Sequence, residues 1–192
     1  MFEARSALAR FNEARDGAGG AQLRLAEVRG WHLAHLTAFS AHSGEFTRCL
    51  ALAFGADPPA DLYRGITHGN ARLVRLTRDQ YWWIAGDDTG LRRLAQELPP
   101  SAGAVTTLSA ARVRLRVEGP AARDMLAKGI AIDLHPAVFA VGHSAQTGLH
   151  HNGIFVERVA ADAYELFVPR TFAASIWEWL MDAALPYGVT RE

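Results

Sequence analysis

The same order of predicted elements occurs in the first and in the second half of this sequence. Short apolar runs rich in β-branched and aromatic residues predict strands, whereas apolar residues three or four positions apart predict helices. In the first half, strands are predicted at 22–28, 32–39, 73–76 and 81–85, and helices at 45–54 and 91–98. In the second half, strands are predicted at 105–108, 112–117, 145–149, 153–159 and 164–168, and helices at 119–129 and 170–184. The order strand, strand, helix, strand, strand, helix predicts two similar halves.

Glycine and proline mark the divisions between these parts. Residues 1–20 end in Asp-Gly-Ala-Gly-Gly, a composition that favours a flexible N-terminal arm. The first half then covers 21–100, closed by two prolines, and the second half covers 101–192. The stretches 70–98 and 152–180 share one pattern of apolar positions, which indicates a duplication. Meandering strands with helices packed on one side predict antiparallel or mixed sheets of the α+β class, not a doubly wound parallel sheet.

The charge balance and the cysteine content exclude several classes of protein. Twenty basic and twenty acidic side chains cancel, so no long-range field attracts nucleic acid or an anionic membrane. The single cysteine, Cys49, has no partner for an internal disulfide, and the mixed charges of the first residues are unlike a signal peptide. No apolar stretch approaches the roughly 20 residues needed to cross a bilayer. We expect a cytoplasmic protein that is not embedded in a membrane.

Side chains capable of catalysis or metal binding form no recognisable motif. The sequence has no Walker or dinucleotide-binding loop and no CxxC, HExxH or GxSxG motif. His143, His150 and His151 lie close together, but no Cys or carboxylate pattern completes a metal shell, and the adjacent pair would point to opposite faces of an extended segment. Asp87 and Asp88 precede a predicted helix and are expected to cap it. We predict no catalytic, cofactor-binding or metal-binding residue on this chain.

Three arginines alternate with aliphatic residues along one predicted strand. Arg112, Arg114 and Arg116 therefore share one face of the strand, and the intervening aliphatic residues face the core. Such a row is either a solvated face of a sheet or a set of forks that bind carboxylates of another subunit or of a polyglutamyl ligand. Both interpretations stay open, and the three arginines are interface candidates.

The last predicted helix carries more apolar surface than one core needs. Its apolar arc spans roughly 200°, about twice what a surface helix buries against one core. Either the helix is buried within this chain, or it contributes to a subunit interface through Trp177 and Met181. Trp83, in a strand with two further aromatic residues, raises the same question and is also an interface candidate.

The second half also contains a set of motifs in a specific order and spacing. They are Gly119-Pro120-Ala121-Ala122-Arg123, Leu126-Ala127-Lys128-Gly129, Asp133-Leu134-His135-Pro136, Gln146-Thr147, Arg170-Thr171-Phe172-Ala173 and Trp177-Glu178-Trp179-Leu180. On these residues the stretch 112–184 resembles the gamma-subunit family of heterotetrameric sarcosine oxidases, and the first hundred residues match it only loosely. The family commonly has Ser where this chain has Thr171, which keeps the hydroxyl. Arg170 joins the interface candidates.

The resemblance implies a fold related to the folate-binding domains of aminomethyltransferases. It also implies a non-catalytic accessory subunit in a complex with alpha, beta and delta subunits, which demethylates sarcosine to glycine and transfers the one-carbon unit to tetrahydrofolate. FAD, FMN, NAD and tetrahydrofolate are then expected on the partner subunits, and none on this chain. The alternatives are a subunit of a related N-methyl amino acid demethylase or dehydrogenase complex, and a free-standing folate or small-ligand binding protein.

Overall fold

A computed structural model describes residues 6–11 and 20–191, and the chain divides into two compact units. Unit 1 comprises residues 1–29 and 111–192, and unit 2 comprises residues 30–110. These bounds differ from the predicted halves, 21–100 and 101–192. The reason is that β1 (Leu23–Val28) pairs antiparallel with β7 (Arg112–Glu118), so the first strand belongs to the sheet of the second half.

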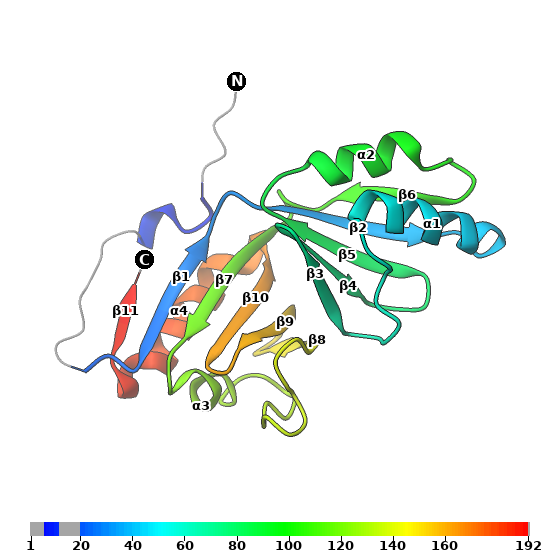
Figure 1. The fold of residues 1–192 in the computed structure, drawn as a ribbon. Coiled ribbons are helices and arrows are strands. Elements are labelled where there is room, and N and C mark those ends of the chain that lie inside the picture. The colour runs from blue at the N-terminus through cyan, green and yellow to red at the C-terminus, as the bar shows by residue number, and fades with distance from the viewer. Residues whose placement is uncertain (1–5, 12–19, 192) are drawn as a thin grey trace. The chain divides into compact units, whose positions relative to one another are not determined.

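The sheet of unit 1 has six strands in the order β11-β1-β7-β10-β9-β8 (Figure 1). Neighbouring strands are antiparallel, except that β1 and β11 are parallel, so the sheet is mixed. The other elements of this unit are η1 (Ala9–Phe11), α3 (Ala122–Leu126), β8 (Ser144–Leu149), β9 (Asn152–Ala160), β10 (Ala163–Pro169), η3 (Arg170–Phe172), α4 (Ala173–Ala184), η4 (Leu185–Tyr187) and β11 (Val189–Arg191).

The sheet of unit 2 has five strands, all antiparallel, in the order β3-β4-β5-β2-β6 (Figure 1). Its elements are β2 (His32–Ala38), η2 (Ser40–His42), α1 (Ser43–Phe54), β3 (Gly65–His68), β4 (Ala71–Arg75), β5 (Gln80–Ala85), α2 (Thr89–Glu97) and β6 (Gly103–Thr107). Both α1 and α2 contribute to one apolar core with this sheet. The predicted α+β class with antiparallel or mixed sheets is confirmed.

The two units share one order of elements. Unit 2 runs β2, α1, β3, β4, β5, α2, β6, and unit 1 from β7 onward runs β7, α3, β8, β9, β10, α4, β11. Their sheets also agree, because β3-β4-β5-β2-β6 corresponds to β8-β9-β10-β7-β11 with β1 inserted before the last strand. The two similar halves are confirmed, and the structure differs from the predicted order in that three strands, not two, precede α2 and α4. The four-residue strand β3 has too little apolar patterning to be recognised, and β1 does not belong to the repeat.

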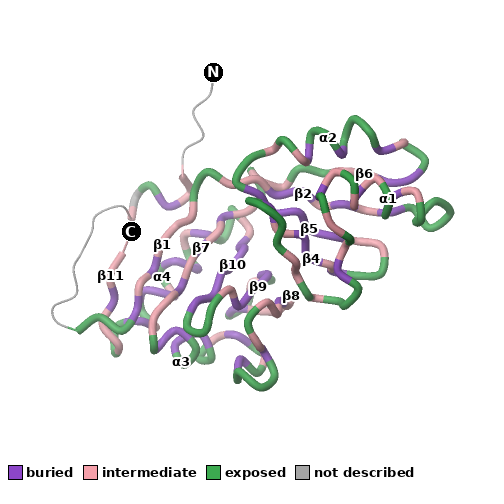
Figure 2. Tube along the Cα trace, viewed as in Figure 1, coloured by how far each residue is buried: buried purple, intermediate pink, exposed green. Residues whose placement is uncertain are grey.

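Each unit has its own cluster of buried apolar residues from its strands and helices, and Figure 2 shows the buried positions in purple. In β7, Val113, Leu115 and Val117 are at most 3% exposed, and the alternate residues are half-buried. In unit 2, Phe46 and Leu50 of α1 are fully buried in the same way. Burying one such side chain stabilises a fold by about 1.5–3 kcal/mol. The helix-covered face of each sheet is therefore the core of its unit.

Helix α1 ends where the sequence predicts, whereas helix α3 does not have its predicted bounds. Helix α1 ends at Gly55, whose φ of 88° suits glycine and whose N–H donates to the carbonyl of Ala51. Helix α3 is much shorter than the predicted 119–129. Gly119 has a φ of 125°, and a Cβ there would lie 2.2 Å from the carbonyl oxygen of Gln22, so this glycine turns the chain beside β1 and does not start the helix.

Part of the predicted N-terminal arm is packed against unit 1. Residues 1–5 and 12–19 of that arm lie outside the described residues. In residues 6–11, the side chain of Leu8 is only 2% exposed and belongs to the core of unit 1. The hydroxyl of Ser6 donates to the carboxylate of Glu27 on β1 and accepts from the N–H of Leu8. Among the described residues, no helix is long and apolar enough to cross a membrane.

Candidate functional site

The predicted row of arginines takes part in a charged network on the sheet of unit 1. The guanidinium of Arg114 donates to the carboxylate of Glu165 at 2.8 Å. Arg116 donates to Glu118 at 2.5 Å and to Glu165 at 3.5 Å. Arg24 of β1 also pairs with Glu118. Arg24 lies opposite Glu118 and Arg116 lies opposite Glu165 in the registers of the sheet, and Arg114 is two residues from Arg116 along β7, so the sheet brings the charges together.

Two groups in and beside this network have shifted pKa values, Glu118 and Arg112. Hydrogen bonds from Arg116 and then Arg24 favour the charged carboxylate and lower the pKa of Glu118. Burial lowers the pKa of Arg112, the third arginine of the row. The side chains of Arg114 and Arg116 are 21% and 34% exposed, so they are only partly available to another molecule. Their own glutamates already neutralise them, which favours a charged sheet face. A role of this row in binding a partner stays a prediction.

Helix α4 places its predicted interface residues inside unit 1. Trp177 is 4% exposed and Met181 is 8% exposed, and both belong to the core. Helix α4 packs against α3 as well as against β10, so a wide arc of the helix, which includes Trp177 and Met181, is buried. The alternative interpretation, a helix buried within the chain, therefore describes these two residues. The exposed apolar side chains lie instead at the ends of the helix, at Phe172 (48%) and Leu185 (69%).

The two remaining interface candidates differ in exposure. Trp83 is 3% exposed in the core of unit 2, where its ring meets that of Phe54 edge-on at 5.2 Å between centroids. It is a core residue, because β5 presents it to α1. Arg170 is exposed in η3, and its backbone N–H donates to the carbonyl of Ala111 at 3.0 Å. Of the predicted set, Arg170 has the most accessible position.

The histidine pair and the aspartate pair have structural positions. His150, with φ of 56°, lies in the turn between β8 and β9, so its ring meets that of His151 at 5.3 Å. The expected opposite orientation does not occur, because the segment is a turn and not an extended strand. The carboxylate of Asp87 accepts the N–H of Thr89 at 2.8 Å, and Asp88 pairs with Arg92. Among the described residues, no three His, Cys, Asp or Glu side chains form a group that could hold a metal.

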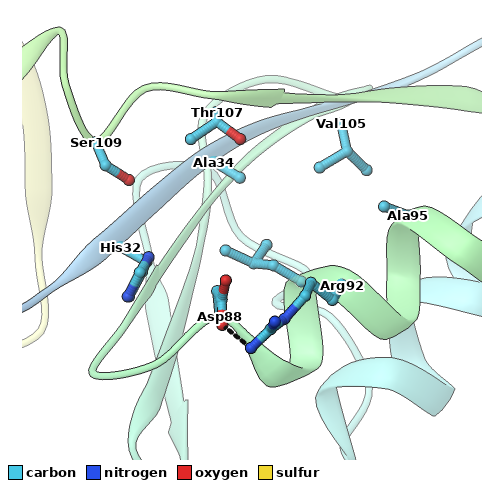
Figure 3. A pocket seen from close by; sticks show the side chains of 9 residues that line it. His32, Ala34, Asp88, Arg92, Ala95, Val105, Thr107 and Ser109 are labelled. Carbon is cyan, nitrogen blue, oxygen red and sulfur yellow. Dashed lines mark hydrogen bonds and ion pairs between the residues drawn. The ribbon is translucent and has the colours of Figure 1, made fainter. Parts of the chain in front are cut away.

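A pocket of about 200 Å³ lies within unit 2, between α2 and the neighbouring strands β2 and β6 (Figure 3). Its lining residues are His32, Ala34, Asp88, Leu91, Arg92, Ala95, Val105, Thr107 and Ser109. The floor is aliphatic and the rim is polar, and Asp88 and Arg92 form an ion pair at the rim. No sequence motif marks this pocket, because its residues come from three separate segments of the chain.

The chain was compared with known families, curated proteins and solved structures. Residues 38–185 match the sarcosine oxidase, gamma subunit family. The chain belongs to this family. The sarcosine oxidase subunit gamma of Corynebacterium sp. (strain U-96) is 29% identical over 177 residues, which cover 92% of this chain and 86% of the relative. That of Arthrobacter sp. is 31% identical over 137 residues, which cover 70% of this chain and 67% of the relative.

Two solved structures extend the comparison to the fold. A chain of the heterotetrameric sarcosine oxidase from Corynebacterium sp. U-96, in complex with pyrrole 2-carboxylate, matches with a TM-score of 0.85 and 28% identity, over 96% of both chains. The glycine cleavage system aminomethyltransferase T from Bartonella henselae matches with a TM-score of 0.67 and 17% identity, over 89% of this chain and 48% of that one. The predicted relation to the aminomethyltransferase fold is confirmed.

Proposed function

We propose that this chain is the gamma subunit of a heterotetrameric sarcosine oxidase and acts there as an accessory subunit. The observation that carries the proposal is the match to a chain of such a complex over 96% of both chains, with a TM-score of 0.85. The family match also extends over both units. It covers residues 38–185, which include most of unit 2 and residues 111–185 of unit 1.

The internal contacts support an accessory role. Two carboxylates with lowered pKa values are engaged in contacts within the chain, Glu118 with Arg116 and Asp87 with Thr89. FAD, FMN, NAD and tetrahydrofolate then belong to the alpha, beta and delta partners, as the family resemblance implies. The cytoplasm is the proposed compartment, since a single cysteine suits a reducing environment.

Reconstitution with and without this chain tests the proposal. The alpha, beta and delta subunits are expressed together, and this chain is added to half of the preparation. We expect it to join the other three in one particle and to raise the stability of that particle, because each bound subunit stabilises the assembly by mass action. Sarcosine turnover per flavin is compared between the two samples. A chain that never joins the particle contradicts the proposal.

The same reconstitution separates the alternative functions. An N-methyl amino acid such as N-methylglutamate replaces sarcosine in a parallel assay, and preferred turnover of that substrate assigns the chain to the related demethylase class. For the free-standing alternative, tetrahydrofolate is added to the isolated chain and thermal unfolding is followed. A ligand that binds the native state alone raises the melting temperature. We expect no shift, since the matching aminomethyltransferase is about twice as long as the region that this chain covers.

A further inference from the structure

We propose that the edge strand β6 and the pocket beside α2 together bind an extended segment of a partner subunit, which adds a strand to the sheet of unit 2 and inserts an aliphatic side chain into the pocket. The inference rests on the proposed function, because it assigns a contact within that complex.

The hydrogen-bond pattern of β6 leaves one row of backbone groups directed away from β2. The N–H of Leu108 donates to the carbonyl of Leu33, and the N–H of Phe39 donates to the carbonyl of Ala102. Hydrogen-bonded pairs alternate with non-hydrogen-bonded pairs in an antiparallel ladder. Thr107, opposite Ala34, therefore falls in a non-hydrogen-bonded pair, and its N–H and carbonyl point to the outer edge. The same reasoning applies to Val105.

This outer edge lacks the usual protection of an edge strand. Among the described residues, β6 ends the sheet of unit 2. Natural edge strands avoid pairing with other chains by means of charged side chains or proline, and Gly103–Thr107 has neither. The last two residues of the strand are exposed. An extended peptide that adds to such an edge gains main-chain hydrogen bonds, and a neighbouring pocket selects its side chain.

The pocket lies beside that edge. Val105 and Thr107, whose backbone groups point outward, also line the pocket with their side chains. On the opposite wall, Leu91 of α2 is 8% exposed, and Ala34 of β2, at the floor, is 1% exposed. A strand paired with β6 would therefore hold every second side chain close to an aliphatic floor.

The charges at the rim favour an uncharged side chain in the pocket. Asp88 and Arg92 pair with each other at the first turn of α2, so the rim presents no net charge from this pair. A charged side chain entering the pocket would lose hydration without gaining a free partner there, whereas an aliphatic one would bury apolar surface. The occupant that fits is a strand carrying Leu, Ile, Val or Met at the inserted position.

In unit 1, segments of this chain from outside the repeat add a strand to the sheet and a leucine to the core. In unit 2 the pocket lies near the start of β2 and the beginning of α2. At this end of the sheet, His32 of β2 pairs with Ala85, the last residue of β5. In unit 1 the same end is marked by the pairing of Pro169 with Arg112, and Glu27, which binds Ser6, lies at this end of β1. Leu8 of the same segment belongs to the core of unit 1. Unit 1 thus has an extra strand, β1, between β7 and β11 and a leucine from outside the repeat in its core, whereas the partner segment would add its strand outside β6.

Two pairs of variants test this contact. Thr107→Pro removes one outward N–H without removing a hydrogen bond to β2, and Thr107→Ala is its control, because it keeps the backbone donor. Ala95→Trp blocks the pocket from the exposed surface of α2, and Gln96→Trp places the same ring on a neighbouring exposed residue that does not line the pocket.

Each purified variant is titrated into the assembled alpha, beta and delta subunits, and its dissociation constant is measured. Circular dichroism establishes that each variant is folded, and if Thr107→Pro is not, Ala95→Trp decides alone.

We expect Thr107→Pro and Ala95→Trp to weaken binding by at least about tenfold, as loss of a central contact does. The two controls should stay within about twofold, as for ordinary surface changes. Wild-type binding with both test variants unchanged overturns the inference and leaves the proposed function intact. Failure of the wild-type chain itself to bind contradicts the proposed function instead. A self-association of this chain that Thr107→Pro abolishes, with partner binding retained, also overturns the inference, because the edge then binds a second copy.

Discussion

The two units of this chain have the same order of elements but close the same end of the fold differently. In unit 1, β1 widens the sheet and the segment 6–11 packs Leu8 into the core. In unit 2, no strand is inserted between β2 and the edge strand β6, and a pocket of about 200 Å³ lies beside α2. A shared order of elements therefore does not dictate how the core is completed, since segments outside the repeat supply the last contacts.

Two arginines, one in each unit, have contrasting surroundings. In unit 1, Arg158 is 6% exposed and its guanidinium donates to the carbonyls of Phe139 and Ala161. In unit 2, the side chain of Arg92 is 69% exposed and pairs with Asp88 of the same helix. A buried cation needs every donor satisfied, whereas an exposed pair is screened by water. Position 158 is thus expected to tolerate substitution less well than position 92.

The largest effect is expected for Arg158→Met. The variant keeps much of the side-chain length but leaves the two carbonyls without their charged donor, and hydrogen bonds to charged groups are worth about 1.5–3 kcal/mol each, which gives a loss of about 4 kcal/mol. Chemical denaturation of the purified chain measures the loss. Arg92→Met is the matched variant in unit 2, with an expected loss below about 1 kcal/mol. Equal losses would remove the contrast between the units.

Leu8→Ala should cost about 3 kcal/mol, because it empties a fully packed position in unit 1. Leu52, 60% exposed on α1 of unit 2, is the control, and Leu52→Ala should change the free energy of unfolding by less than about 0.5 kcal/mol. Thermal unfolding of both variants makes the comparison. A loss at Leu8 no greater than at Leu52 would mean that the segment 6–11 does not complete the core of unit 1.

Gly129→Ala should cost about 2 kcal/mol through overpacking. A Cβ at this position would lie 2.4 Å from the ring of Trp179, so the ring or the backbone has to shift. At Gly153, also in unit 1, a Cβ would meet nothing within 4 Å, and Gly153→Ala is therefore the control. Denaturant midpoints of the two alanine variants measure the difference. Loss of stability in Gly153→Ala alone would contradict the packing of α4 over the segment that follows α3.

The smallest effect is a pH dependence in the charged network of unit 1. The pKa of Glu118 is lowered in the folded state, so its contribution to stability is present above the pKa of an unfolded glutamate, about 4.3, and is lost as the pH falls through the lowered folded value. Glu118→Gln should therefore lose less stability than the wild type when the pH falls through that range. The difference should stay below about 1 kcal/mol, because the pair is partly exposed. Denaturation curves at several pH values measure it, and identical pH profiles would contradict the ion pairing.

The sequence predicted most elements of both units but not their assignment to units. The alternation of arginine and aliphatic residues in β7 and the apolar rows of α4 follow from local periodicity, and the structure contains both elements. The pairing of β1 with β7 joins residues about ninety positions apart, which local patterns do not encode. The short β3 and β11 were missed, because strands of four and three residues carry too few alternating positions.

The candidate sites depended even more on tertiary packing. The apolar excess of α4 predicted that something covers Trp177, but only the placement of α3 against α4 identifies that cover as part of the same unit. The row of arginines was correctly placed on one face, but of its partners only Glu118 is close in sequence, at the end of β7, whereas Glu165 comes from the neighbouring strand β10. The pocket beside α2 combines His32, Arg92 and Thr107 from three segments and could not be predicted from spacing.

The most direct test of the central claim is purification of this chain, tagged, from its native host. The co-purifying polypeptides are identified and the visible absorption spectrum is recorded. We expect three further chains in fixed ratio, a flavin spectrum and sarcosine-dependent turnover. A chain that emerges alone and colourless from cells growing on sarcosine would contradict its assignment as a subunit.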